Sequence, residues 1–144
     1  MIFGSDRDQL RGLYLETWRK MQEGEALEPL ERQIAAVIEQ HPEYHRILAD
    51  REVALAREYL PEMGETNPFL HMGLHIAIQE QLSTGRPHGI VECFHRLKLR
   101  LGDAHAAEHE MIECLAESLW EAQRDGVAPD EQRYLERLQE RARQ

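Results

Sequence analysis

Helix start and stop signals follow one another along this chain and leave little room for any other secondary structure. Asn67-Pro68 and His41-Pro42 each place proline after a residue suited to the position before the first turn, where the fixed φ of proline is already helical. Glycines such as Gly102 and Gly126 stand where helices end. Runs with the two-residue alternation of a β-strand are almost absent. The chain is therefore predicted to be all-α.

The same signals set the boundaries of the expected helices, which cover residues 5–23, 27–40, 42–59, 67–84, 88–101, 103–125 and 129–144. Leu60-Pro61 and Gly64 are expected to end the third of them. The sequence contains no repeat and no linker long enough to separate two domains. We expect a single helical domain over residues 1–144, resembling a four-helix bundle with additional short helices.

Charge and cysteine content exclude several classes of function. The formal net charge is −10, which argues against non-specific binding to nucleic acid or anionic lipid, because basic side chains drive both. No stretch of eighteen apolar residues is present, and the first residues lack the apolar segment of a secretory signal. Cys93 and Cys114 show no CxxC spacing, so reduced thiols in a cytoplasmic protein are expected.

Histidine is the unusual residue of this chain. Six of the eight histidines form three pairs, each with a spacing of four residues: His41 and His45, His71 and His75, and His105 and His109. Residues four apart project from one face of a helix, one turn from each other. Two imidazoles placed in this way can bind one metal ion or bracket two, as in helical His-x-x-x-His sites.

Two of the pairs continue the apolar stripe that is expected to face the core. His71 and His75 align with Ile78 and Leu82, and His105 and His109 align with Ile112, Ala116 and Leu119. Glu113 follows His109 at a further step of four residues. A carboxylate beside two imidazoles suits iron, manganese or zinc. His105, His109 and Glu113 are therefore predicted metal ligands, together with His71 and His75.

A simple up–down–up topology brings these two pairs together. It makes the helices over 67–84 and 103–125 parallel, and both pairs lie near the amino-terminal ends of their helices. Helix amino termini disfavour protonated imidazole, which keeps ring nitrogens available as ligands. The four imidazoles are expected to meet at one end of the bundle.

The third pair fits two arrangements. If its helix is antiparallel to the next, His41 and His45 lie about 25 Å from His71, and Glu58 is the carboxylate near the site. If the connection from residue 60 to 67 is extended, a parallel arrangement brings the pair to the site with Glu52. His45 and His41 complete the predicted ligand set.

Three segments of the sequence resemble a bacterial family: HPEYH at 41–45, NPFLHMGLHIAIQEQ at 67–81 and GDAHAAEHEMIECLAESLWEAQR at 102–124. That family is known only as a domain of unknown function, largely from proteobacteria, and it implies no activity. Paired histidines with a carboxylate in a helical bundle are also similar to hemerythrin-like and other non-haem di-iron proteins. The chain departs from the hemerythrin pattern at Gln79, four residues after His75, where that pattern has a glutamate.

The sequence is consistent with three functions. The first is a non-haem metal protein, with iron and a di-iron site preferred, for oxygen or redox chemistry or for sensing. The second is a mononuclear zinc bundle. The third is a metal-free acidic module for protein interaction, in which the histidines are buried and hydrogen-bonded or form a pH-sensitive cluster.

The carboxy-terminal helix is very polar but carries a few apolar residues on one side. Its narrow apolar strip, Tyr134, Leu135 and Leu138, is expected to dock on the bundle, with a homodimer contact as the alternative. His88 and His95 lack partners at ligand spacing and are expected to be structural or surface residues.

Overall fold

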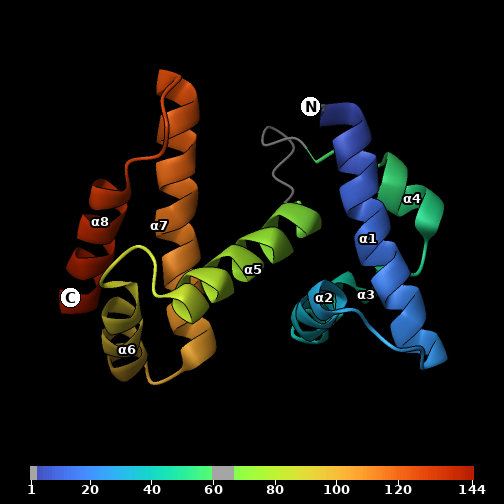
Figure 1. Ribbon diagram of the computed structural model, residues 1–144, viewed down its shortest axis with the longest axis horizontal. Helices are drawn as coiled ribbons and strands as arrows, with labels where there is room; N and C mark the ends of the chain where they lie inside the picture. The colour runs from blue at the N-terminus through green and yellow to red at the C-terminus, as the bar shows by residue number, and fades with distance from the viewer. Residues whose placement is uncertain (1–2, 60–66) are drawn as a thin grey trace. The chain divides into compact units, whose positions relative to one another are not determined.

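The computed structural model describes residues 3–59 and 67–144, with side chains from residue 7 onward (Figure 1). Within these ranges the secondary structure is entirely helical, which confirms the all-α prediction. The elements are α1 (Phe3–Glu23), α2 (Pro29–Glu39), the short 3-10 helix η1 (Pro42–Tyr44), α3 (His45–Leu48), α4 (Arg51–Ala56), α5 (Pro68–Thr84), α6 (Ile90–Leu101), α7 (Ala104–Asp125) and α8 (Glu131–Arg143). None of these helices has the length and apolar character needed to span a membrane.

The capping signals place α5 and α7 where the sequence predicts them. The Asn67 Oδ1 accepts hydrogen bonds from two backbone amides of the first turn of α5, at 3.0 and 3.2 Å. The Asp103 carboxylate does the same for α7, accepting from a backbone amide at 2.9 Å. Gly102 and Gly126 end α6 and α7 in the left-handed conformation, with φ of 75° and 66°. These caps satisfy backbone groups that a helix end leaves without intrahelical partners.

The continuous helix predicted over residues 42–59 is wrong, because the chain forms η1, α3 and α4 there instead. Asp50 causes the last break. Its backbone is extended, and its side chain accepts a hydrogen bond from the Val53 amide at 3.3 Å, so it starts a new helix. The predicted terminators Leu60, Pro61 and Gly64 lie outside the described residues.

The chain divides into two compact units, residues 1–73 and 74–144. The boundary falls within α5, whose first turns belong to the first unit and whose remaining turns belong to the second. The expectation of one domain over residues 1–144 stays a prediction. Each unit has its own buried residues and is described by itself.

In the first unit, α1 packs against α2, α3 and α4. The buried apolar side chains come from all of these helices and from the start of α5: Tyr14, Leu15, Ile34, Ala35, Val37, Ile38, Leu48, Ala54, Phe69 and Met72. Arg11 is also buried and donates to the carbonyl oxygens of Ala54 and Arg57, at 2.9 and 2.7 Å. It thereby satisfies carbonyl groups at the end of the short helix α4, where no further helical amide is available.

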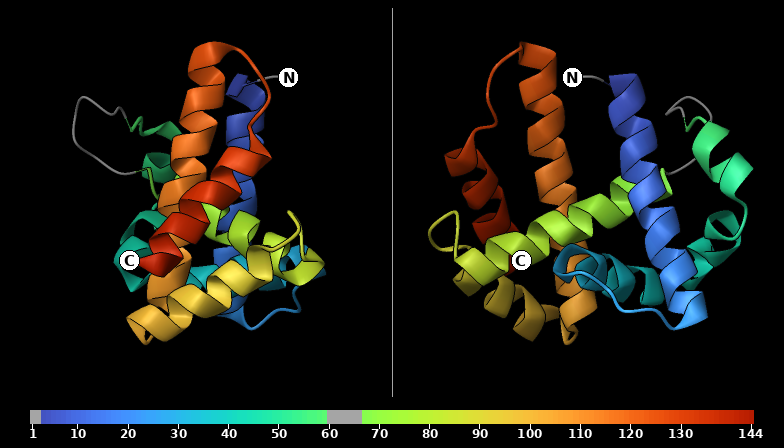
Figure 2. Two further views of the ribbon diagram at one scale, coloured as in Figure 1. Left: turned by 90° about the vertical axis from the view of Figure 1, so that its left-hand side faces the viewer. Right: turned by 45° about the vertical axis from the view of Figure 1, so that its right-hand side comes forward.

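In the second unit, α6, α7 and α8 pack on one another (Figures 1 and 2). Their buried side chains form a core with Ile78 from α5: Ile90, Cys93, Leu97, Ala107, Met111, Ile112, Cys114, Tyr134, Leu135 and Leu138. The predicted docking of the α8 strip is confirmed, since Leu138 is fully buried. The predicted core stripe of α7 is wrong at Leu119, which is 40% exposed.

We predict that Leu138→Ala lowers the free energy of unfolding by about 2–5 kcal/mol, because it removes a fully buried side chain and leaves a cavity. Urea denaturation followed by circular dichroism measures the change. Leu99→Ala is the matched control: Leu99 is 85% exposed, so its loss is expected to change stability by no more than about 0.5 kcal/mol. Equal effects of the two substitutions would contradict the observed packing of α8.

Candidate metal centre

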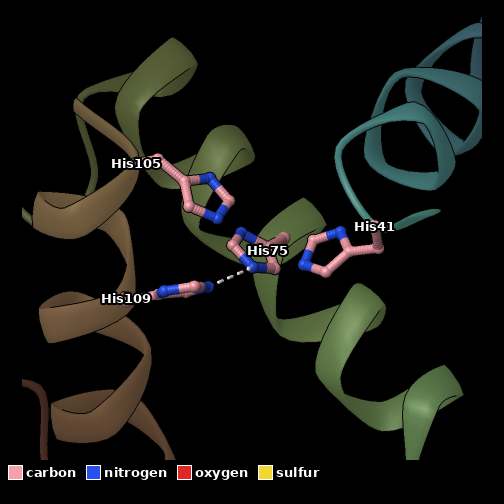
Figure 3. A group of neighbouring side chains, drawn as sticks. All are labelled: His41, His75, His105 and His109. Carbon is pink, nitrogen blue, oxygen red and sulfur yellow. Dashed lines mark hydrogen bonds between the residues drawn. The ribbon is translucent and has the colours of Figure 1, made fainter. Parts of the chain in front are cut away.

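Three histidines of the second unit converge on one point: His75 of α5 with His105 and His109 of α7 (Figure 3). Each ring offers a nitrogen, and these nitrogens lie within 4.8 Å of one another. His75 is fully buried, whereas His105 and His109 are partly exposed. His41, drawn in the same figure, belongs to the first unit and is described with that unit below.

The helices account for this convergence. His105 and His109 stand one turn apart on α7, and their ring centroids are 4.3 Å apart. The His75 ring lies against both, with centroid distances of 5.3 Å to His105 and 4.9 Å to His109. The two helices thus supply ligand-bearing side chains from two directions.

Hydrogen bonds assign the protons of the His75 ring. Its Nδ1 lies 2.7 Å from the Glu108 Oε1. Because a carboxylate accepts hydrogen bonds, the His75 Nδ1 is the donor, and in the neutral ring the Nε2 then carries the lone pair. That Nε2 lies 3.2 Å from the Nε2 of His109 (dashed line in Figure 3).

The separation of these two nitrogens fits metal coordination. Zinc binds imidazole nitrogen at about 2.0–2.1 Å, so two nitrogens on a tetrahedral ion are about 3.3 Å apart. The His75 and His109 nitrogens are already at 3.2 Å. The full group spans up to 4.8 Å, so closing on one ion requires movements of at most about 1.5 Å.

Glu113 is not brought to these rings. Its side chain is 66% exposed, and its carboxylate accepts a hydrogen bond from Arg141 of α8 at 2.9 Å. The neighbouring residue Ile112 takes the core-facing position on this turn of α7. The carboxylate beside the histidines belongs instead to Glu108, which the sequence reasoning missed. Its position three residues after His105, on the same face of the helix, is the signal that could have found it.

In the first unit, His41 and His71 are neighbours. Their ring centroids are 5.1 Å apart and the rings meet edge to face. His41 is buried, its Nδ1 lies 2.8 Å from the Val37 carbonyl oxygen, and Tyr44 stacks on its ring. Both histidines are predicted metal ligands. In the first unit they lie beside each other and beside the ring of Tyr44.

His45 has the surroundings of a structural histidine. Its Nε2 lies 2.8 Å from the Ile38 carbonyl oxygen, and its ring packs on Trp18 with a centroid distance of 4.7 Å. The two carboxylates suggested for this part of the chain, Glu52 and Glu58, are exposed. His45 is also absent from the group of described residues that could hold a metal ion.

The two cysteines lie in the core of the second unit, apart from the histidine group. Burial raises the pKa of the Cys114 thiol to about 11 and also raises the pKa of Cys93. A high pKa keeps a thiol protonated, and a protonated thiol is a poor nucleophile and a poor metal ligand. Both residues act as small apolar side chains.

Residues 6–140 match the family described as a domain of unknown function (DUF1841), and the chain belongs to that family. Comparison with curated proteins and with solved structures gave no match. The resemblance to a family of unknown function is thereby confirmed. Its proteobacterial range and the likeness to hemerythrin stay predictions.

We predict that Cys114 resists alkylation in the folded protein. With a pKa of about 11, only about one thiol in a thousand is ionised at pH 8, and the side chain is fully buried. Iodoacetamide labelling read by mass spectrometry should show slow modification of the native chain and rapid modification in urea. Rapid labelling of native Cys114 would contradict the buried position of this face of α7.

Proposed function

We propose that this protein binds one transition-metal ion through the imidazole nitrogens of His75, His105 and His109. The observation that carries the proposal is the arrangement of three ring nitrogens within 4.8 Å, two of them at the spacing of neighbouring metal ligands. Ring nitrogens that face one another at this distance can share one metal ion.

The ligand set supports a single ion of a metal that accepts imidazole. Nitrogen ligands suit zinc, iron, copper and nickel. A di-iron centre of the kind preferred from the sequence needs bridging carboxylates. Glu113 instead pairs with Arg141, and the Glu108 carboxylate accepts a hydrogen bond from His75. One zinc or iron ion is therefore favoured, and a di-iron centre stays a prediction.

Three protein ligands leave a coordination position for water or a substrate. An ion bound here would supply Lewis-acid chemistry if it were zinc, and redox chemistry if it were iron. The contributions of the chain itself are to hold two rings on α7 one turn apart and to present the buried His75 ring from α5.

The metal-free alternative rests on the same short contact. If His109 carries its proton on Nε2, it donates to the lone pair of the His75 Nε2 at 3.2 Å, and the cluster is a buried hydrogen-bonded network. The net charge of −10 would then serve recognition of a protein partner. A cytoplasmic location and a homodimer stay predictions, as does the exclusion of nucleic acid and membranes as partners.

We predict that replacing His75 and His109 together with alanine abolishes metal loading. Untagged protein should carry close to one equivalent of metal, or take it up from zinc or cobalt solution. Inductively coupled plasma mass spectrometry measures the metal content. The double variant should hold less than about a tenth of an equivalent, because two of three ligands are lost.

A variant with His88 and His95 replaced by alanine is the matched control, since both side chains are exposed and their loss should leave loading unchanged. Wild-type protein that takes up less than about a tenth of an equivalent would overturn the proposal and favour the metal-free module. The optical spectrum of freshly purified protein separates ferric iron, which absorbs in the visible, from colourless zinc.

The remaining sequence-based ligands are tested in the same titration. We predict that alanine at His41 or His71 weakens metal binding at least about tenfold if either residue is a ligand. Alanine at His45, whose ring is bonded to a backbone carbonyl, is expected to change stability and not affinity. Unchanged affinity in all three variants would confine the ligand set to the second unit.

A further inference from the structure

We infer that Glu108, itself held by Gln79, is the positioning residue of this centre and fixes which nitrogen of His75 faces the metal. This inference rests on the proposed function. It assigns a role to two side chains that the ligand set alone does not require.

The geometry links three side chains in series. The Glu108 Oε1 lies 2.7 Å from the His75 Nδ1 and accepts a second hydrogen bond from the Gln79 Nε2 at 3.3 Å. Gln79 stands four residues after His75, so one face of α5 supplies both donors. The Glu108 carboxylate on α7 therefore accepts hydrogen bonds from two successive turns of α5.

Burial strengthens the hydrogen bond between His75 and Glu108. The His75 side chain is fully buried and the Glu108 side chain is only 13% exposed, so water competes little for either group, and a charge-assisted hydrogen bond is strong there. A proton held on Nδ1 leaves the lone pair on Nε2, the nitrogen that lies 3.2 Å from His109. The carboxylate also fixes the orientation of the ring.

The same contacts argue that Glu108 acts through His75 and not as a ligand. Its Oε1 already accepts from both His75 and Gln79. Among the residues that the structure describes, the group able to hold a metal contains histidines and no carboxylate. Gln79, where the hemerythrin pattern has a glutamate, serves as a neutral donor to this carboxylate.

Substitution of Glu108 tests the inference. We expect Glu108→Ala to weaken cobalt and zinc binding by about 10- to 100-fold, as loss of a hydrogen-bond partner of a ligating histidine usually does. Glu108→Gln keeps an oxygen acceptor, so it should restore part of the affinity. Glu113→Gln is the matched control on the same helix, because Glu113 is exposed and bonds Arg141.

The metal-free protein gives a second readout that packing alone would not move. Nitrogen-15 NMR of the imidazoles should show His75 protonated at Nδ1 in the wild type. In Glu108→Ala the proton should shift toward Nε2 or exchange between the two nitrogens. Gln79→Leu should produce the same change in weaker form, with circular dichroism confirming that each variant is folded.

A double-mutant cycle separates positioning from direct ligation. In the His75→Ala background, removal of the Glu108 carboxylate should cost no further affinity for cobalt, because its only route to the metal is through His75. A further loss of tenfold or more would show that Glu108 is a ligand and would overturn the inference. Unchanged affinity and an unchanged His75 tautomer in Glu108→Ala and Glu108→Gln would overturn it too.

These outcomes are distinct from failure of the proposed function. If wild-type protein binds neither cobalt nor zinc, the metal centre itself is refuted. If wild-type protein binds and the Glu108 variants bind equally well, the centre stands and only the positioning role is refuted.

Discussion

The arrangement of the second unit depends on one buried ring and the need to satisfy both of its nitrogens. A histidine with no exposed surface cannot rely on water, so each nitrogen must find a partner within the protein. His75 meets one need with the Glu108 carboxylate and the other with His109, and both partners come from α7. The position of α7 beside α5 is thus specified by polar contacts as well as by apolar packing.

The apolar part of that specification lies next to the rings. Ile78 stands one turn beyond His75 on α5, and Ile112 stands one turn beyond His109 on α7; both belong to the same buried core. Helix α8 adds Tyr134, whose hydroxyl donates to the Gln81 Oε1 of α5 at 2.7 Å. A core that fixes the backbones on which the ligands stand is what a precise metal site requires.

Local signals predicted the helices that frame the histidines, because a cap depends only on residues within one turn of it. Asn67 and Asp103 are caps of this kind, readable from sequence. The break at Asp50 was not predicted, because aspartate also occurs inside helices. At this position the side chain caps a new helix, although the sequence is also compatible with one continuous helix. Glu113 was predicted because it continues the four-residue spacing of His105 and His109. The carboxylate beside the rings belongs to Glu108, three residues after His105. Only the packing of α5 against α7 determines which of the two carboxylates meets the rings.

The separation of the thiols from the imidazole group has a consequence for how the site would behave in a cell. Sites built on cysteine lose their metal when oxidants convert thiolates to disulfides or sulfenic acids. Among the residues that the structure describes, the group that could hold a metal contains only histidines, and both cysteines are buried, with raised pKa values. Metal retention at such a site would be set by competition with protons and would be insensitive to the thiol redox state of its surroundings.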